Sequence, residues 1–178
     1  MKRSFDNPWQ KGSPRLQGYD YSADGVYFIT ICTYKRQRFF GKIIKGRMNL
    51  SPAGKIVAEE WGKTPMIRAN MNLTLDEWCI MPDHFHALLV IGNPILPEIN
   101  PHLPPIDSPP AEFVSPSKNL GAIMKGFKGA CKRRIRQTEI VNFDWQERYY
   151  DHIIRDQESL QRIRKYITDN PKNWKGGE

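Results

Sequence analysis

The sequence has few cysteines, no long apolar run and little negative charge. Its three cysteines, Cys32, Cys79 and Cys131, are widely spaced and form no Cys-X-X-Cys pair. We therefore expect buried, reduced thiols in a cytoplasmic protein rather than disulfides or a zinc site. No apolar stretch approaches the roughly 20 residues of a membrane span. The first residues also lack the apolar core of a signal peptide, so we expect no membrane partner.

Positive charge is in excess. Of the 178 residues, 27 are Lys or Arg and 19 are Asp or Glu, which gives a formal net charge of +8. Such an excess favours a polyanionic partner, most commonly a phosphate backbone, although a basic surface can also serve solubility alone. The length and the ordinary hydrophobic content predict one domain with a real core.

Much of this charge lies on one predicted helix, over about 117–138. Its apolar residues are spaced for one buried stripe, formed by Leu120, Ile123, Phe127, Cys131 and Ile135. The opposite side would be a basic ridge, formed by Lys125, Lys128, Lys132, Arg133, Arg134 and Arg136, of which all but Arg134 are candidate DNA contacts. This arrangement predicts a track for DNA phosphates.

The chain divides into a polar arm over 1–24 and a single domain over 25–174, with a Pro-rich loop over 93–117. β-forming runs predict strands at about 26–34, 73–80 and 84–91, a hairpin within 41–50, and a short strand before residue 155. Helices should follow the N-caps Ser51 and Asp156, with Pro65 ending or kinking the first and Asn170 closing the last. This pattern predicts an α+β sandwich with a mainly antiparallel sheet.

The motif His84-Phe85-His86 opens the apolar run that ends at Ile91. Because side chains alternate in a strand, both imidazoles should project from one face, roughly 6.5–7 Å apart, and Phe85 from the other. Two ring nitrogens at this spacing can bind one metal ion. The alternative is two half-exposed histidines at a sheet edge.

The last helix, from Asp156 to Asn170, carries a second pattern. Leu160, Ile163 and Ile167 form its buried stripe, while Tyr166 and Asn170 share a neighbouring side one turn apart. A phenol and a carboxamide then project together. The alternative interpretation is a tyrosine at the core edge and an asparagine that caps the helix.

Five ordered segments resemble one family. They are Tyr27-Phe28-Ile29-Thr30-Ile31-Cys32, Met81-Pro82-Asp83-His84-Phe85-His86, Leu120-Gly121-Ala122-Ile123, Trp145-Gln146-Glu147-Arg148-Tyr149-Tyr150-Asp151-His152 and Ile163-Arg164-Lys165-Tyr166-Ile167-Thr168-Asp169-Asn170-Pro171. In order and spacing they resemble the single-tyrosine HUH transposases, in particular the REP-associated tyrosine transposases of bacteria. The resemblance covers roughly residues 15–174.

The resemblance implies a ferredoxin-like, mainly antiparallel sheet with helices packed on one face. It implies a metal-dependent endonuclease and strand transferase that acts on single-stranded DNA at hairpin-forming palindromes. Tyr166 would be the nucleophile and would form a 5′-phosphotyrosine intermediate. His84, His86 and Asn170 would hold Mg²⁺ or Mn²⁺. Such a protein would be cytoplasmic and associated with the bacterial nucleoid.

The resemblance also suggests DNA contacts from Arg15 in the arm and from the loop residues Lys35, Arg36 and Arg38. His152 can be a DNA contact or an ordering residue of its strand. Lys165, beside Tyr166, is a further candidate DNA contact. Lys165 and the metal are also alternative aids to deprotonation of the phenol.

Other aromatic roles and the assembly stay open. Tyr149 and Tyr150 are rival nucleophiles by residue type. Base-stacking candidates, which can equally be core residues, are Trp145, Tyr149 and Trp174. Both a monomer and a homodimer fit the sequence.

Two other functions fit part of the pattern. A non-catalytic nucleic-acid-binding module on a ferredoxin-like fold needs the basic charge and the aromatics, but gives no reason for the histidine, tyrosine and asparagine positions. A metallohydrolase with water as the nucleophile would use the histidines and leave Tyr166 idle.

Overall fold

The computed structural model of the protein describes residues 19–96 and 119–176. Its strands are β1 (Gly25–Cys32), β2 (Gly41–Ile44), β3 (Arg47–Leu50), β4 (Leu73–Met81), β5 (His84–Ile91) and β6 (Tyr150–Ile154). Its α-helices are α1 (Pro52–Ile67), α2 (Leu120–Arg136) and α3 (Gln157–Asp169). The predicted strands, hairpin and helices are all present. Most of the predicted arm and of the Pro-rich loop lies outside the described residues.

Four strands form one antiparallel sheet in the order β4-β5-β1-β6, and β2 and β3 pair as a separate hairpin. Without that hairpin, the order of elements up to β6 is β-α-β-β-α-β, the ferredoxin-like arrangement. The predicted α+β class with a mainly antiparallel sheet is confirmed. The histidine strand β5 lies between β4 and β1, so the histidines are not at a sheet edge.

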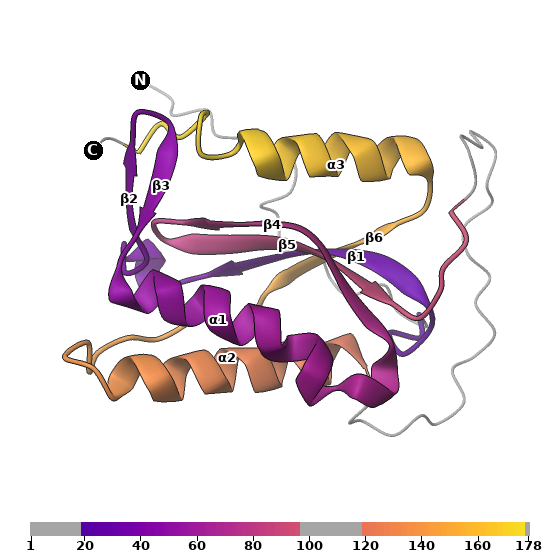
Figure 1. The fold of residues 1–178 in the computed structure, drawn as a ribbon, viewed down its shortest axis with the longest axis horizontal. Helices are drawn as coiled ribbons and strands as arrows, with labels where there is room; N and C mark the ends of the chain where they lie inside the picture. The colour runs from indigo at the N-terminus through magenta and orange to yellow at the C-terminus, as the bar shows by residue number, and fades with distance from the viewer. Residues whose placement is uncertain (1–18, 97–118, 177–178) are drawn as a thin grey trace.

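Helices cover both faces of the sheet. Helices α1 and α2 lie side by side on one face, and α3 crosses the other (Figure 1). The prediction of helices on one face therefore holds for α1 and α2 but is wrong for α3. The physical reason is that the central strands carry apolar side chains on both faces, and each face needs a cover.

Two hydrophobic cores follow from this layering. The larger core lies under α1 and α2, where the rings of Trp61, Phe85 and Phe127 meet at centroid distances of 5.1 to 5.6 Å. The predicted buried stripe of α2 is confirmed and belongs to this core. The smaller core lies under α3 and consists of Leu160, Ile163 and Ile167 against Val26, Phe28, Leu88 and Ile154.

Two local predictions need correction. Helix α1 begins as predicted, with Ser51 Oγ accepting from the Gly54 N–H at 3.1 Å, but it continues past Pro65 to Ile67. Pro65 lacks the N–H that would bond to the carbonyl four residues earlier, but the Arg68 N–H still donates to the Thr64 carbonyl at 3.2 Å, so the helix continues past the proline.

The cysteines are free, as predicted, but only Cys131 is buried; Cys32 and Cys79 are half-buried. The latter two lie opposite His84 and His86 in the sheet, on the face that α3 covers only in part. Among the described residues, no helix combines the length and apolar character needed to cross a bilayer.

Removal of the N-cap of α3 should destabilise the protein. Asp156 Oδ1 accepts from the Ser159 N–H at 2.6 Å, and this hydrogen bond lowers the pKa of the carboxyl group. We expect Asp156→Ala to lower the free energy of unfolding by about 1 kcal/mol at pH 7, measured by urea denaturation.

The same carboxyl predicts a pH dependence. The pKa of Asp156 is lower in the folded protein than in the unfolded chain, where it is about 4. The cap therefore contributes its full stabilisation above pH 4, and this contribution is lost as the pH falls through the folded-state pKa. The difference between wild type and Asp156→Ala should therefore shrink in acid. Glu158→Gln, in the exposed first turn, is the matched control and should change stability less. A difference that stayed constant down to pH 2 would contradict the assignment.

Candidate active site

The two histidines of β5 project from the same face of the sheet. His84 and His86 are 6% and 5% exposed, and their ring centroids are 4.6 Å apart. Phe85 turns to the opposite face and packs against Trp61. The alternation predicted from the sequence is confirmed, and the pair is more buried than the alternative interpretation expected.

Each imidazole has a partner at its Nδ1 atom. His84 Nδ1 lies 2.5 Å from Oδ1 of Asp83, and His86 Nδ1 lies 2.7 Å from the Thr30 hydroxyl. Thr30 reaches His86 because the two residues are directly opposite in the β1–β5 register. In both rings, Nε2 is therefore the nitrogen left to face other groups.

Burial disfavours the charged form of both rings. Burial is the main cause that lowers the pKa of His84, and the neighbouring Asp83 carboxylate partly opposes it. Burial lowers the pKa of His86 well below its ordinary value, and His84 and Arg36 add to the effect. A neutral imidazole is the form that can bind a metal ion.

Helix α3 brings Tyr166 to this pair. The phenol oxygen of Tyr166 lies 3.5 Å from Nε2 of His86, and the two ring centroids are 5.3 Å apart. The residue as a whole is 36% exposed. Helix α3 is fixed by its apolar stripe and by Arg164, whose Nε and Nη2 contact the carboxylate of Asp76 on β4 at 3.0 and 2.5 Å.

Asn170 follows directly after α3 and is half-buried. Its backbone N–H donates to the Ile167 carbonyl, while its carboxamide has no hydrogen-bond partner among the described residues. Among all the residues that the structure describes, no group of three His, Cys, Asp or Glu side chains could hold a metal ion. Two imidazole nitrogens and a carboxamide are nevertheless a donor set that fits a divalent cation and leaves positions open for a substrate. The roles of these residues stay predictions.

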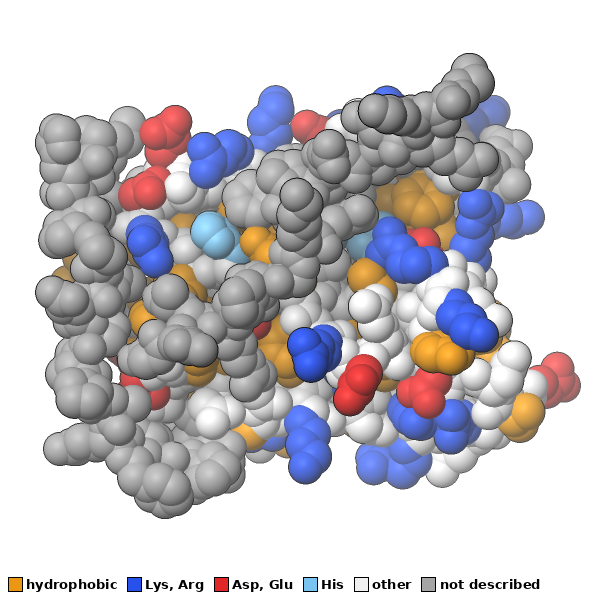
Figure 2. All heavy atoms as spheres, turned by 180° about the vertical axis from the view of Figure 1, so that it is seen from behind, with side chains coloured by type: hydrophobic (Ala, Val, Ile, Leu, Met, Phe, Trp, Pro, Cys, Tyr) orange, Lys and Arg blue, Asp and Glu red, His pale blue; other side chains and the backbone are white. Residues whose placement is uncertain are grey.

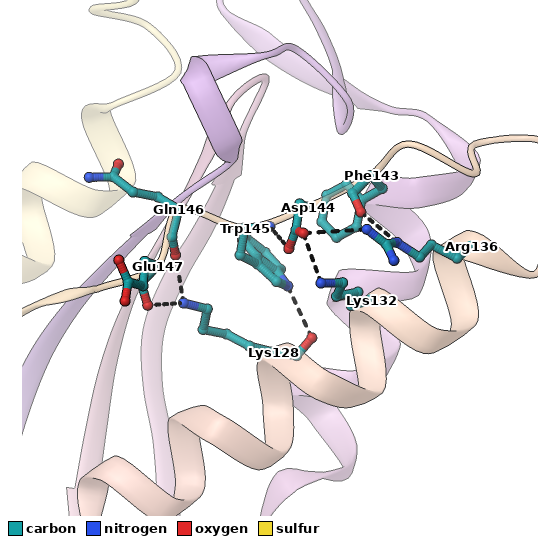
Figure 3. Close-up of polar contacts among 8 residues, drawn as sticks. All are labelled: Lys128, Lys132, Arg136, Phe143, Asp144, Trp145, Gln146 and Glu147. Atoms are coloured by element: carbon teal, nitrogen blue, oxygen red, sulfur yellow. Dashed lines mark hydrogen bonds and ion pairs between the residues drawn. The ribbon is translucent and has the colours of Figure 1, made fainter.

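The basic residues of α2 lie on the other side of the sheet from the histidines. Several of them hold the segment Phe143–Glu147 (Figure 3). Lys128 Nζ donates to the carbonyls of Gln146 and Glu147 at 2.7 and 3.0 Å. Lys132 Nζ contacts Asp144 Oδ2 at 2.8 Å.

Arg136 completes this network, since its Nε donates to the Phe143 carbonyl at 2.9 Å and its Nη2 contacts Asp144 Oδ2 at 3.3 Å. Lys125 and Arg133 are exposed. Three of the five predicted phosphate contacts therefore have a structural task, and the phosphate track stays a prediction.

The remaining predicted DNA contacts are dispersed. Lys35, Arg36 and Arg38 are exposed in and after the turn that follows β1. Lys165 is exposed, with its Nζ 4.0 Å from Asp169 Oδ2, and Arg15 lies outside the described residues. Where described residues are visible on the face that Figure 2 presents, Lys and Arg side chains lie at several separate places.

Of the three aromatic candidates for base stacking, two belong to the core and one lies beside the histidines. Trp145 is a core residue, 5% exposed, with its indole N–H donating to the Lys128 carbonyl at 3.1 Å. Tyr149 packs against the larger core. Trp174 is different, since its ring centroid lies 6.1 Å from that of His84 and 5.8 Å from the Arg38 guanidinium.

Two further residues share the histidine face. His152 is half-buried and lies opposite Phe28 in the β1–β6 register, and burial is the main cause that lowers its pKa. Tyr150 packs on Phe28, with ring centroids 6.3 Å apart.

Sequence reasoning missed Asp83 and Thr30. The role of Asp83 could have been predicted, because it directly precedes His84 in the sequence. Thr30 was not, because its contact with His86 depends on the pairing of two strands that are distant in sequence.

Comparison with known proteins gives two informative similarities. No family profile matches the sequence. An uncharacterised protein of Haemophilus influenzae is 34% identical over 162 residues, which cover 91% of this chain and 88% of that protein. The structure of a REP-associated tyrosine transposase bound to a REP hairpin matches with a TM-score of 0.54 and 16% identity, over 90% of this chain and 73% of that one. The chain therefore belongs to the same family as the Haemophilus influenzae protein, and it has the fold of a REP-associated tyrosine transposase.

Proposed function

We propose that the protein is a transposase, a metal-dependent enzyme that cuts and rejoins single-stranded DNA at hairpins in the bacterial cytoplasm. One observation carries the proposal: the phenol oxygen of Tyr166, a partly exposed residue, lies 3.5 Å from Nε2 of His86, beside His84. The net charge of +8 and a fold shared with a transposase that binds a REP hairpin support DNA as the substrate.

The phenol is suited to a covalent step. Tyr166 Oη attacks the phosphorus of a phosphodiester and forms a P–O bond to the 5′ side of the DNA, while the P–O3′ bond breaks. The released 3′ oxygen takes up a proton and becomes a hydroxyl. Because the phosphotyrosine ester keeps the energy of the original bond, rejoining needs no ATP.

A divalent cation would be held by Nε2 of His84 and of His86 and by the carboxamide of Asn170. When bound, Mg²⁺ or Mn²⁺ supplies Lewis acidity to the scissile phosphate and helps to orient it. Imidazole ligands suit Mn²⁺ better than Mg²⁺, which prefers oxygen. The histidines themselves contribute neutral, buried donors, which leave the charge of the cation undiminished.

Loss of the phenol proton needs assistance, because an ordinary tyrosine has a pKa of about 10. Nε2 of His86 lies 3.5 Å from the phenol oxygen, but its single lone pair would be bound to the cation. The cation itself would then be the aid, because a nearby positive charge favours the phenolate. Lys165 is less favoured, because its exposed ammonium lies near Asp169.

The covalent step predicts a DNA adduct that depends on one hydroxyl. With a single-stranded hairpin oligonucleotide and Mn²⁺, wild type should form a covalent adduct on a denaturing gel. Tyr166→Phe should form none and still bind the DNA, because only the oxygen is lost. Tyr150→Phe is the matched control and should keep the adduct.

The other outcomes separate the remaining functions. Cleavage without an adduct in Tyr166→Phe would indicate a metallohydrolase. Absence of cleavage in wild type on every hairpin tested would indicate a non-catalytic binding module. An adduct that persisted in Tyr166→Phe would assign the nucleophile elsewhere.

The metal assignment predicts a loss of cation affinity. His84→Ala or His86→Ala should weaken Mn²⁺ binding at least 10-fold and sharply lower adduct formation, with the circular dichroism of the fold preserved. His152→Ala removes a third histidine from the same face and should leave Mn²⁺ affinity unchanged. The measurement is isothermal titration calorimetry with Mn²⁺. Equal Mn²⁺ affinity in wild type and the three variants would refute the assignment of His84 and His86 as ligands.

Trp174 would stack a base beside the histidines, because its ring centroid lies 6.1 Å from that of His84. Stacking of a base on an aromatic ring contributes about 1–3 kcal/mol, so Trp174→Ala should weaken single-strand binding about 5- to 160-fold in fluorescence anisotropy. Trp78→Ala removes a tryptophan of β4 that is 38% exposed and packs on Phe85, and should bind normally. Equal weakening by both substitutions would argue against a stacking site.

A further inference from the structure

A buried carboxylate links the histidine pair to the loop after β1. Asp83 lies in the tight turn between β4 and β5, and its side chain is 9% exposed. Its Oδ1 contacts His84 Nδ1 at 2.5 Å, and its Oδ2 contacts Arg36 Nε at 3.2 Å. Each oxygen of this carboxylate therefore has one partner, as a buried charge requires.

We propose that Asp83, clamped by Arg36, is a positioning residue that fixes His84 in the tautomer with its proton on Nδ1 and so aims the Nε2 lone pair at the cation site. This inference rests on the proposed function, because the cation gives Nε2 its task. It assigns Asp83 no contact with substrate or metal.

The chemistry of the partners supports one tautomer. A neutral imidazole carries one N–H, and an ionised carboxylate can only accept. Nδ1 of His84 must then be the donor, which leaves Nε2 as the free acceptor. His86 is not fixed in this way, because the Thr30 hydroxyl at its Nδ1 can donate or accept.

The loop that carries Arg36 contains two residues with an unusual backbone conformation. Lys35 and Arg36 both have positive φ, at 53° and 56°, a region that residues with a Cβ rarely adopt. Such conformations persist where surrounding contacts over-determine them, and they cluster at functional sites.

Hydrogen bonds hold the turn that contains these two residues. The Arg36 N–H donates to the Thr33 carbonyl at 3.0 Å, the Thr33 N–H donates to the Asp83 carbonyl at 2.9 Å, and the Tyr34 N–H donates to the Asp144 carbonyl at 2.9 Å. The Thr33 hydroxyl lies 2.7 Å from the Gln37 carbonyl and 3.0 Å from the Asp83 carbonyl. The loop is thereby tied to the residue whose side chain Arg36 contacts.

Arg36 has a second attachment on the same face. Its Nη1 donates to Sγ of Cys32 at 2.8 Å, and Cys32 lies opposite His84 in the β1–β5 register. Nε and Nη1 are thus both engaged within the protein. A residue predicted to contact DNA therefore has an internal task, which is to hold the carboxylate of Asp83 toward His84.

The test reads the tautomer directly in the metal-free protein. Long-range ¹H–¹⁵N correlation spectra distinguish a protonated Nδ1 from a protonated Nε2. In wild type, His84 should carry its proton on Nδ1. In Asp83→Asn the amide can donate to Nδ1, so the Nε2-protonated form should appear, and Mn²⁺ affinity should fall about 10- to 100-fold.

Glu60→Gln is the matched control. Glu60 is as buried as Asp83, since the two side chains are 8% and 9% exposed, and it pairs with Arg134 at 2.6 Å on the other side of the sheet. This variant should leave both the His84 tautomer and the Mn²⁺ affinity unchanged. Arg36→Gln is the second test variant should Asp83→Asn fail to fold, and it should also raise the Nε2-protonated population.

The outcomes keep the two proposals apart. A wild-type His84 protonated on Nε2, or a tautomer unaffected by both Asp83→Asn and Arg36→Gln, would overturn the positioning role. The expected tautomer shift in a protein that binds no Mn²⁺ would support the positioning role and refute the metal function.

Discussion

The packing of α3 against the second face of the sheet is the interaction on which the candidate site depends. Leu160, Ile163 and Ile167 bury their side chains there, and the Arg164–Asp76 pair ties the helix to β4. Without this cover, the apolar residues of that face would meet water and Tyr166 would have no fixed position. A hydrophobic contact and one ion pair therefore set the distance between the phenol and His86.

The two faces of the sheet have different tasks. Helices α1 and α2 enclose the larger core, and cations of α2 fasten the Phe143–Glu147 segment. That segment supports the loop after β1 through the Tyr34–Asp144 backbone contact, and the loop carries Arg36 to Asp83. The opposite face collects His84, His86 and Tyr166. The cations of α2 on one side of the sheet are thus connected to His84 on the other side by a continuous series of contacts, through the Phe143–Glu147 segment, the loop after β1 and Asp83.

The sequence predicted what depends on local periodicity. The alternation around Phe85 placed both histidines on one face, and the spacing of Leu160, Ile163 and Ile167 identified the buried side of α3. It did not predict that α3 covers the second face, because this depends on apolar residues contributed by several strands. It also did not predict the internal partners of Lys128 and Lys132 on α2, because their acceptors lie in a later segment that only tertiary structure brings close. Thr30 was missed for the same reason.

The central claim is that the Tyr166 phenol and the two imidazoles meet around one cation. Anomalous diffraction from crystals of the protein grown with Mn²⁺ tests it most directly. The account predicts one manganese peak bonded to Nε2 of both His84 and His86, with the Tyr166 oxygen on the same side of the sheet. A protein that bound manganese only elsewhere, or that placed Tyr166 away from the histidines, would contradict it.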